Sequence, residues 1–384
     1  MPTRSMGYLA LVLVILSSCS SSPNAPRTAA NVSRPAPAAQ EPAAEPKVLV
    51  PPAEPAAPNI VYLHYYLWWT PAHWKQKLGP FYPYGDPSLP LPGAIDQSGC
   101  SPRASYNGAA IVDVPADGLY DQGDATAIDR QIATAAAAGV TGFLLDWQGT
   151  GLSNQSVRSS GANGRLDLVV GRVNAYDATH GRKFALGLAL GVYGEYDRSK
   201  VRMLADLDYF SRRYGSNPAF RNAYSPNPIV MLMASRRYSP GVLPALSALR
   251  SNLYLVGDET SASWPLDQAN LDAASYYWSS ENPWSNTNAG TEIMKLGTAV
   301  HASGKRWFAP FIPGYDKQLA GGMCVPRNGI ETMHKLWEIN GASRPEAWFG
   351  ISWNEYVENT YLEPSQAYGA TYLNELASLI ATPR

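Results

Sequence analysis

Residues 125–147 read ATAIDRQIATAAAAGVTGFLLDW, and within this stretch a helical pattern changes to a strand pattern. The first part predicts a helix over Ala125–Ala138, and Gly139 follows where a left-handed helix end favours glycine. The β-rich apolar run Thr141–Trp147 then predicts a buried strand. This stretch therefore encodes one helix followed by one strand, and we use it as the unit for the rest of the chain.

The same alternation continues from Asn59 to the end of the chain, where glycines also follow two further helices at positions 181 and 304. The other predicted strands are Ile60–Tyr66, Phe184–Leu190, Ile229–Met233, Leu253–Val256, Ala274–Trp278, Trp307–Ile312 and Trp348–Trp353. The other predicted helices are Leu166–His180, Lys200–Tyr214, Val242–Leu249, Thr291–Ala302, Glu331–Asn340 and Tyr368–Ile380.

Eight strands that alternate with helices over about 325 residues fit a (β/α)8 (TIM) barrel better than a doubly wound sheet. A dinucleotide-binding sheet needs a glycine-rich turn after its first strand, but bulky side chains fill 67–71 (LWWTP). The sequence also contains no P-loop, HExxH or GxSxG motif. We therefore expect one α/β domain, a (β/α)8 barrel, over residues 59–384.

The N-terminal residues have the pattern of an export signal. Arg4 precedes an apolar run, Tyr8–Leu16, which is too short to span a bilayer but fits a signal peptide. The run ends in 16–19 (LSSC), which resembles a bacterial lipobox and predicts lipidation of Cys19; an ordinary signal peptide is the alternative. Residues 20–58 are rich in Ala, Pro and Ser and predict a disordered tether. We expect a lipid-anchored protein of the bacterial cell envelope that faces the periplasm or the exterior.

Composition limits the partners and cofactors. The net charge of -1 and 16% charged residues argue against nucleic acid, which requires a basic surface. An oxidising compartment permits a disulfide between Cys100 and Cys324, although two isolated thiols remain possible. The sequence contains no CxxC motif and no Cys/His cluster, which argues against a structural zinc site. We expect a monomer with no metal and no cofactor.

Carboxylates and aromatic rings follow the predicted strands, at the end of a barrel where active sites lie. Sugar rings pack their C–H faces on Trp and Tyr, while Asp, Glu and Asn bind their hydroxyl groups. Asp146 either binds a hydroxyl or forms a salt bridge at the rim, and Trp147 either carries a sugar or packs in the core. The candidate substrate-binding residues are Tyr65, Tyr66, Trp68, Asp146, Trp147, Tyr277, Trp278, Tyr315 and Asn354.

The most informative segment is 351–364, ISWNEYVENTYLEP. It resembles the last strand and loop of family 99 glycoside hydrolases, the endo-α-mannosidase and endo-α-mannanase group, whose pattern is N-E-W-x-E-G-T-x-x-E-P. WbsX-type domains share this pattern, and family 71 α-1,3-glucanases carry a related one. Residues 64–68, 143–149 and 313–316 resemble further patches of family 99 in the same order, so the resemblance spans about 300 residues and implies the barrel fold.

The resemblance implies that Glu355 acts as a base on the 2-hydroxyl of the sugar and that Glu358 is the acid/base, with net retention. Tyr356, Val357 and Asn359 depart from the pattern, where Trp, His and Gly are usual. We expect a retaining hydrolase of an α-linked oligo- or polysaccharide, mannan-like first and glucan-like second. A non-catalytic carbohydrate-binding or polysaccharide-assembly barrel of the WbsX type is the alternative. A glycosyltransferase would need a nucleotide-sugar site, and this sequence has no phosphate-binding loop.

Overall fold

The computed structural model describes residues 59–84, 100, 111–150, 160–181, 184–191, 199–317 and 323–382. The chain divides into two units, Met1–Ala53 and Glu54–Arg384, and every described residue belongs to the second. The predicted signal peptide with Cys19 and the predicted tether over 20–58 lie outside the described residues. Within these ranges, none of the helices combines the length and apolarity that crossing a bilayer requires.

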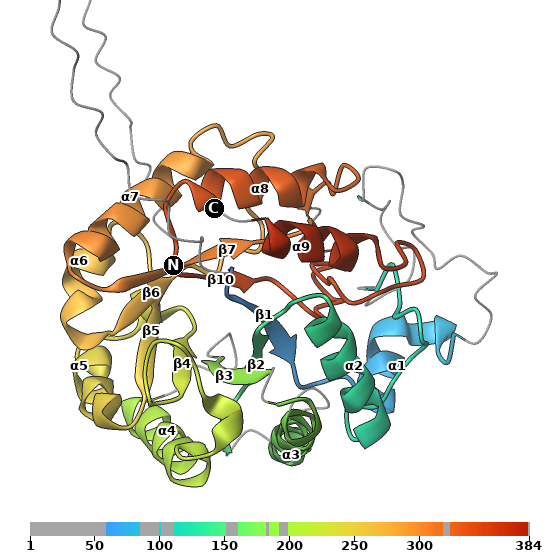
Figure 1. The fold of residues 1–384 in the computed structure, drawn as a ribbon, viewed down its shortest axis with the longest axis horizontal. Coiled ribbons are helices and arrows are strands. Elements are labelled where there is room, and N and C mark those ends of the chain that lie inside the picture. The colour runs from blue at the N-terminus through green and yellow to red at the C-terminus, as the bar shows by residue number, and fades with distance from the viewer. Residues whose placement is uncertain are drawn as a thin grey trace, which may run out of the picture. The chain divides into compact units, whose positions relative to one another are not determined.

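Eight parallel strands close into a barrel in the order β1-β10-β7-β6-β5-β4-β3-β2, which confirms the predicted (β/α)8 fold (Figure 1). The barrel closes where β1 lies between β10 and β2, with Tyr62 paired with both Phe349 and Gly142. The strands are β1 (Val61–Tyr66), β2 (Gly142–Trp147), β3 (Ala185–Leu190), β4 (Ile229–Leu232), β5 (Tyr254–Asp258), β6 (Ala273–Ser275), β7 (Arg306–Phe311) and β10 (Ala347–Gly350).

Helices surround the barrel and cover the outer faces of its strands (Figure 1). All seven predicted helices are found among the described residues, and α4 has the bounds that the sequence predicts. The α-helices are α1 (Pro71–Leu78), α2 (Ala125–Ala137), α3 (Ala162–His180), α4 (Lys200–Tyr214), α5 (Val242–Leu246), α6 (Trp264–Asp267), α7 (Ala289–Ala302), α8 (Glu331–Gly341) and α9 (Thr371–Ala381).

Helix ends follow the local chemistry of the sequence. The Asp124 side chain accepts a hydrogen bond from the Thr126 N–H at 2.9 Å and caps the start of α2. Gly139, Gly181 and Gly304 have φ of 82°, 72° and 72° beyond α2, α3 and α7, which confirms the predicted left-handed positions. These caps orient the chain for its return to the next strand.

Two predicted strands end three residues early in the structure, and several short elements were not predicted. The predicted strand Trp348–Trp353 ends at Gly350, because the Ser352 N–H then bonds the Thr360 carbonyl at 2.8 Å within the following loop. The predicted strand Ala274–Trp278 ends at Ser275 as β6. The unpredicted elements include the short strands β8 (Tyr315–Asp316) and β9 (Cys324–Val325), which form an antiparallel pair, and the helices α1 and α6.

Side chains that alternate along the strands fill the barrel and its outer layer separately. The inward-facing cluster includes Tyr62, Leu144, Ala189, Met231, Val256, Phe308 and Phe349, all buried. A third cluster, with Trp69, Trp74, Tyr356 and Tyr361, packs α1 against the loop that follows β10. Cys100 and Cys324 form a disulfide with Cα atoms 6.0 Å apart, which ties β9 to Cys100.

Candidate active site

Hydrogen bonds within its own loop hold Glu355 after β10. The Ser352 hydroxyl accepts the Glu355 N–H at 2.8 Å, and the Glu355 carbonyl accepts the Thr360 N–H at 3.2 Å. One carboxylate oxygen, Oε1, accepts the Val357 N–H at 2.8 Å. The residue is 4% exposed, so this carboxylate has a fixed position near the surface of the barrel end.

One carboxylate oxygen of Glu358 has a partner in the structure and the other has none among the described residues. The Lys317 ammonium lies 2.9 Å from Oε1, and the Glu358 carbonyl accepts the Asp316 N–H at 2.9 Å. Oε2 is buried and has no hydrogen-bond partner among the described residues. A buried carboxylate oxygen without a partner is costly for folding and is therefore available to a ligand.

Two tyrosines lie beside both glutamates. Burial raises the pKa of the Tyr66 hydroxyl well above its usual value, and the negative charges of Asp146, Glu355 and Glu358 raise it further. Burial also raises the pKa of Tyr315, followed by the charges of Glu358 and Glu355. Because Coulomb interactions weaken with distance, these shared effects indicate that the five side chains lie in the same region. Both phenols remain protonated at neutral pH and can donate hydrogen bonds.

Tyr277 joins this group from the loop after β6. Its hydroxyl forms a short hydrogen bond with the Tyr66 hydroxyl, and its N–H donates to Asp258 Oδ1 at 2.9 Å. Asp258 is fully buried, forms an ion pair with Arg236 and accepts the Ala234 N–H at 2.7 Å. The Tyr277 backbone is therefore anchored by a carboxylate that does not itself reach the surface.

Asn354 and Trp68 both contact Tyr66 and help to fix its position. Asn354 is fully buried, and its amide bonds both backbone groups of Tyr66, at 2.8 Å to the N–H and 3.2 Å to the carbonyl. The expected contact of Asn354 with substrate does not fit this placement, because its hydrogen-bonding groups face the β1 backbone. The Trp68 ring is 3% exposed and packs against the Tyr66 ring, with centroids 4.3 Å apart.

The structure does not bring Tyr65 and Trp147 to this group, so the expectation that they bind sugar does not fit their placement. The Tyr65 hydroxyl bonds Gln131 Oε1 at 2.5 Å, and the Trp147 indole N–H bonds Asn163 Oδ1 at 2.7 Å. Both side chains are fully buried in the layer between the strands and the helices. The side chains of adjacent strand residues point to opposite faces of the barrel wall. Because Tyr66 and Asp146 face the inside of the barrel, their neighbours Tyr65 and Trp147 face the helices.

The departures from the family 99 pattern have local explanations. Tyr356 is fully buried and stacks on Tyr361 with ring centroids 4.3 Å apart, away from the glutamates. Asn359 has φ of 55°, a left-handed conformation that glycine adopts most easily and that asparagine tolerates. Its amide donates to the Asp316 carbonyl at 2.5 Å. The loop therefore keeps the conformation of a glycine position with a different residue.

Sequence reasoning missed Lys317 and gave no role to Glu363. Lys317 pairs with a residue far along the chain, and no local pattern reveals such a pair. Burial raises the pKa of Glu363 to about 7, while hydrogen bonds from Gln131, Tyr120 and Tyr356 lower it. Glu363 therefore ties the loop to α2 beneath the site. In the described ranges, no group of three or more His, Cys, Asp or Glu residues is arranged to hold a metal ion.

Solved structures with the same fold are found by comparison with known proteins. No protein-family profile and no curated protein matches the sequence. Two solved structures of the GH99 endo-alpha-mannosidase from Bacteroides thetaiotaomicron are similar. One, in complex with BIS-TRIS-propane, has 16% identity, covers 84% of this chain and 96% of that chain, and has a TM-score of 0.63. The chain shares their fold.

The second mannosidase structure has 19% identity, covers 83% of this chain and 96% of its own, and has a TM-score of 0.60. A structure described as a glycoside hydrolase-like protein has 14% identity, covers 88% of this chain and 98% of its own, and has a TM-score of 0.58. The resemblance to family 99 that the motif over 351–364 indicates is thus matched by a shared barrel. At these identities the likeness establishes the architecture alone.

Proposed function

We propose that this chain is a retaining glycoside hydrolase that cleaves an α-linked polysaccharide, with Glu358 as acid/base and Glu355 as base. The observation that carries the proposal is the grouping of both glutamates with Tyr66, Tyr315 and Asp146 at the carboxyl ends of the strands. A pair of carboxyl groups next to phenol rings, with Glu358 Oε2 unpaired among the described residues, suits glycosidic cleavage.

The proposed reaction has two steps. Glu355 takes the proton of the sugar 2-hydroxyl, O2 attacks C1, and Glu358 protonates the departing glycosidic oxygen. In the second step Glu358 removes a proton from water, the water oxygen attacks C1, and Glu355 returns its proton to O2. The proton for the first step belongs on Glu358 Oε2, since the Lys317 ammonium faces Oε1. Two inversions at C1 give net retention.

An α-mannan-like chain is the first candidate substrate, because the axial O2 of mannose lies trans to an α-glycosidic oxygen and can attack C1 from the opposite face. An α-glucan is the second; its O2 lies cis to the leaving oxygen, so its cleavage with retention would need a carboxylate in place of O2 as the attacking group. The motif over 351–364 and the activity named for two similar structures both favour mannose. Tyr66, Tyr277 and Tyr315 offer phenol groups to neutral sugar hydroxyls, and Asp146 adds an acceptor. The proposed partner is therefore an oligo- or polysaccharide, bound by a monomer without a cofactor.

We further propose that the enzyme acts outside the cytoplasm on a lipid anchor at Cys19. The pattern over 16–19 and the Ala/Pro-rich segment 20–58 support this, as does a disulfide that needs an oxidising compartment. Mass spectrometry of the mature chain from a bacterial host would find a lipidated N-terminal cysteine. An intact or unlipidated N-terminus would contradict the anchor.

One observation favours a second function, a non-catalytic carbohydrate-binding barrel. The Lys317 ammonium already binds one oxygen of Glu358, and an acid catalyst has no need of such a cation. In that case the same aromatic and carboxylate groups would hold a glycan without cleaving it. The two functions differ in turnover, which can be measured directly.

The test follows the anomeric configuration of the first product by proton NMR during digestion of α-mannan and α-glucan oligosaccharides. Retention predicts that the α-anomer is released first and then mutarotates. Substrates whose reacting sugar lacks the 2-hydroxyl should bind and resist cleavage, because O2 is the proposed attacking atom. Initial release of the β-anomer contradicts the mechanism, and binding of these glycans without turnover supports the non-catalytic function.

A further inference from the structure

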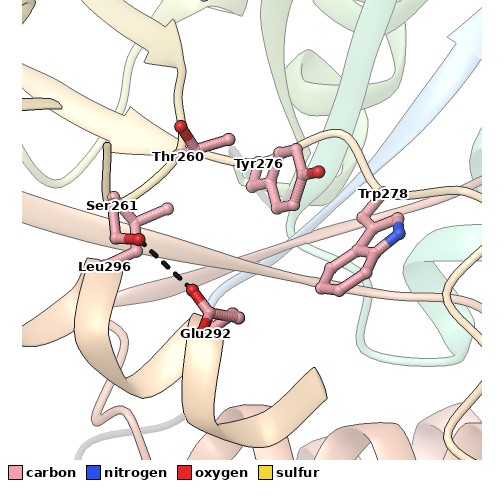
Figure 2. Close-up of a pocket in the computed structure, with 6 residues that line it drawn as sticks. All are labelled: Thr260, Ser261, Tyr276, Trp278, Glu292 and Leu296. Carbon is pink, nitrogen blue, oxygen red and sulfur yellow. Dashed lines mark hydrogen bonds between the residues drawn. The ribbon is translucent and has the colours of Figure 1, made fainter. Parts of the chain in front are cut away.

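The loop after β6 carries an indole ring between two hollows. Trp278 forms a wall of both. Figure 2 shows the smaller hollow, of about 150 Å³, which Tyr276 and Trp278 line on one side and Ser261 and Glu292 on the other. Trp278 is half-buried and packs on the Tyr276 ring, with centroids 5.1 Å apart. The indole is thus held in place and remains reachable.

The larger hollow, about 440 Å³, lies on the other side of Trp278 and has a polar lining. The carbonyl oxygens of the Asn282 and Asn286 side chains accept backbone N–H groups at 2.9 and 3.1 Å. This fixes the orientation of both amides. Their NH2 groups make no hydrogen bond to any residue that the structure describes. Two oriented donors therefore border the hollow together with the hydroxyls of Ser280 and Ser285.

Glu281 lines the same hollow and is only 2% exposed. Its Oε1 has no hydrogen-bond partner among the residues described. Burial raises the pKa of Glu281 to about 8, although an interaction with Asn340 lowers it somewhat. The neutral carboxylic acid that results can both donate and accept a hydrogen bond. A nearly buried acid with an unused oxygen is the second observation that indicates a ligand here.

Two segments of the chain connect residues of the hollow with residues of the proposed active site. Val325 in its wall pairs with Tyr315 across the β8–β9 hairpin, and Cys324 pairs with Asp316. On the other side, Trp278 directly follows Tyr277, whose hydroxyl bonds Tyr66. The β8–β9 pair and the segment Tyr277–Trp278 therefore link residues of the hollow to residues of the proposed site.

We propose that the hollow beside Trp278 is a distal subsite that binds one neutral sugar unit of a long glycan, away from the bond that is cleaved. The inference rests on the proposed function and adds a preference for long chains. A sugar ring would pack its C–H face on the indole, as aromatic rings favour. The Asn282 and Asn286 amides and the Glu281 carboxyl would bind its hydroxyls. Among the lining residues that the structure describes there is no Lys or Arg, which favours a neutral sugar over an acidic one.

The test compares W278A with the parent on a long α-mannan oligosaccharide and on a short activated α-mannoside. We expect KM for the long substrate to rise about tenfold with kcat unchanged, which corresponds to the loss of one ring contact. KM for the short substrate should stay the same, because it ends before the subsite. Y176A, which removes a half-buried tyrosine from α3, is the matched control and should change neither value.

Two variants separate the role of Glu281 from simple packing. E281Q keeps a neutral group that donates and accepts, and should retain the parental KM for the long substrate. E281L fills a similar volume without hydrogen bonds and should raise that KM. Parental behaviour of E281L would remove Glu281 from the subsite, and equal effects of W278A on long and short substrates would overturn the subsite itself.

Binding measurements keep this inference distinct from the proposed hydrolysis. If the parent cleaves no α-glycan, calorimetry with the long α-mannan oligosaccharide still measures the subsite. An affinity about tenfold weaker in W278A than in the parent and Y176A supports the subsite even in a non-catalytic barrel. Equal affinity of all three proteins, or no binding by any of them, overturns it.

Discussion

The Asn354 side chain forms hydrogen bonds to both the N–H and the carbonyl of Tyr66, at 2.8 and 3.2 Å. The Asn354 carbonyl in turn accepts the Trp69 indole N–H at 2.6 Å. The loop that carries the two glutamates is thus attached to the end of β1, where Tyr66 lies. Asn354 positions Tyr66 relative to Glu355, and its own hydrogen-bonding groups face the β1 backbone.

The variant N354A should therefore lose both stability and activity. It leaves the buried N–H of Tyr66 without its partner, while the Gln122 amide still donates to the Tyr66 carbonyl at 2.8 Å. An unpaired buried N–H costs about 1–3 kcal/mol in the free energy of unfolding. Displacement of Tyr66 should also lower kcat by about tenfold. Chemical denaturation and hydrolysis assays measure the two effects, with N288A on the exposed start of α7 as the control. A stable N354A enzyme with parental kcat would contradict this role.

The left-handed conformation of Asn359 predicts an order of stability among substitutions. N359V should lower the free energy of unfolding by about 2 kcal/mol or more, because a β-branched side chain is strained at φ of 55°. N359G should cost less, since glycine adopts this conformation freely and only the hydrogen bond to the Asp316 carbonyl is lost. Urea denaturation of both variants tests the order, and equal losses would contradict it.

Buried carboxyl groups predict that the protein becomes less stable as the pH rises. Burial raises the pKa of Glu281 to about 8 and those of Glu259 and Glu363 to about 7, above the usual value of 4.5. The folded state then binds more protons than the unfolded state between pH 4.5 and about 8, so the free energy of unfolding falls with pH in this window. Thermal melts across the window should show Tm decreasing.

The double variant E281Q/E363Q checks the cause of that decrease. Glutamine cannot ionise, so the slope of Tm against pH should become smaller over the same window. E338Q, on the exposed side of α8, should leave the slope unchanged. A parental slope in the double variant would mean that other groups control the pH dependence.

The fold could be predicted because each strand and helix carries its own pattern. The apolar run over 141–147 and the helix over 200–214 are local signals, and packing in the barrel preserves them. Strand ends were less predictable. Asn354 looked like part of the catalytic edge, yet hydrogen bonds inside the loop after Gly350 turn its side chain toward β1.

The candidate site was predictable where the face of a strand is known. Tyr66 and Asp146 lie with Glu355 and Glu358, whereas Tyr65 and Trp147 point into the helix layer. The alternation of strand side chains already separates these pairs once one inward residue is identified. The ion pair of Lys317 with Glu358 had no such signal, because it depends on the path of two separate loops.

The most direct measurement is the rate at which E358Q hydrolyses an α-mannan oligosaccharide that the parent cleaves. Loss of the acid/base should reduce kcat by at least about 100-fold, while the far-UV circular dichroism and Tm stay close to those of the parent. E338Q, with the same chemical change on exposed α8, should keep full activity. An E358Q protein that cleaves the oligosaccharide at the parental rate would contradict the assignment of Glu358.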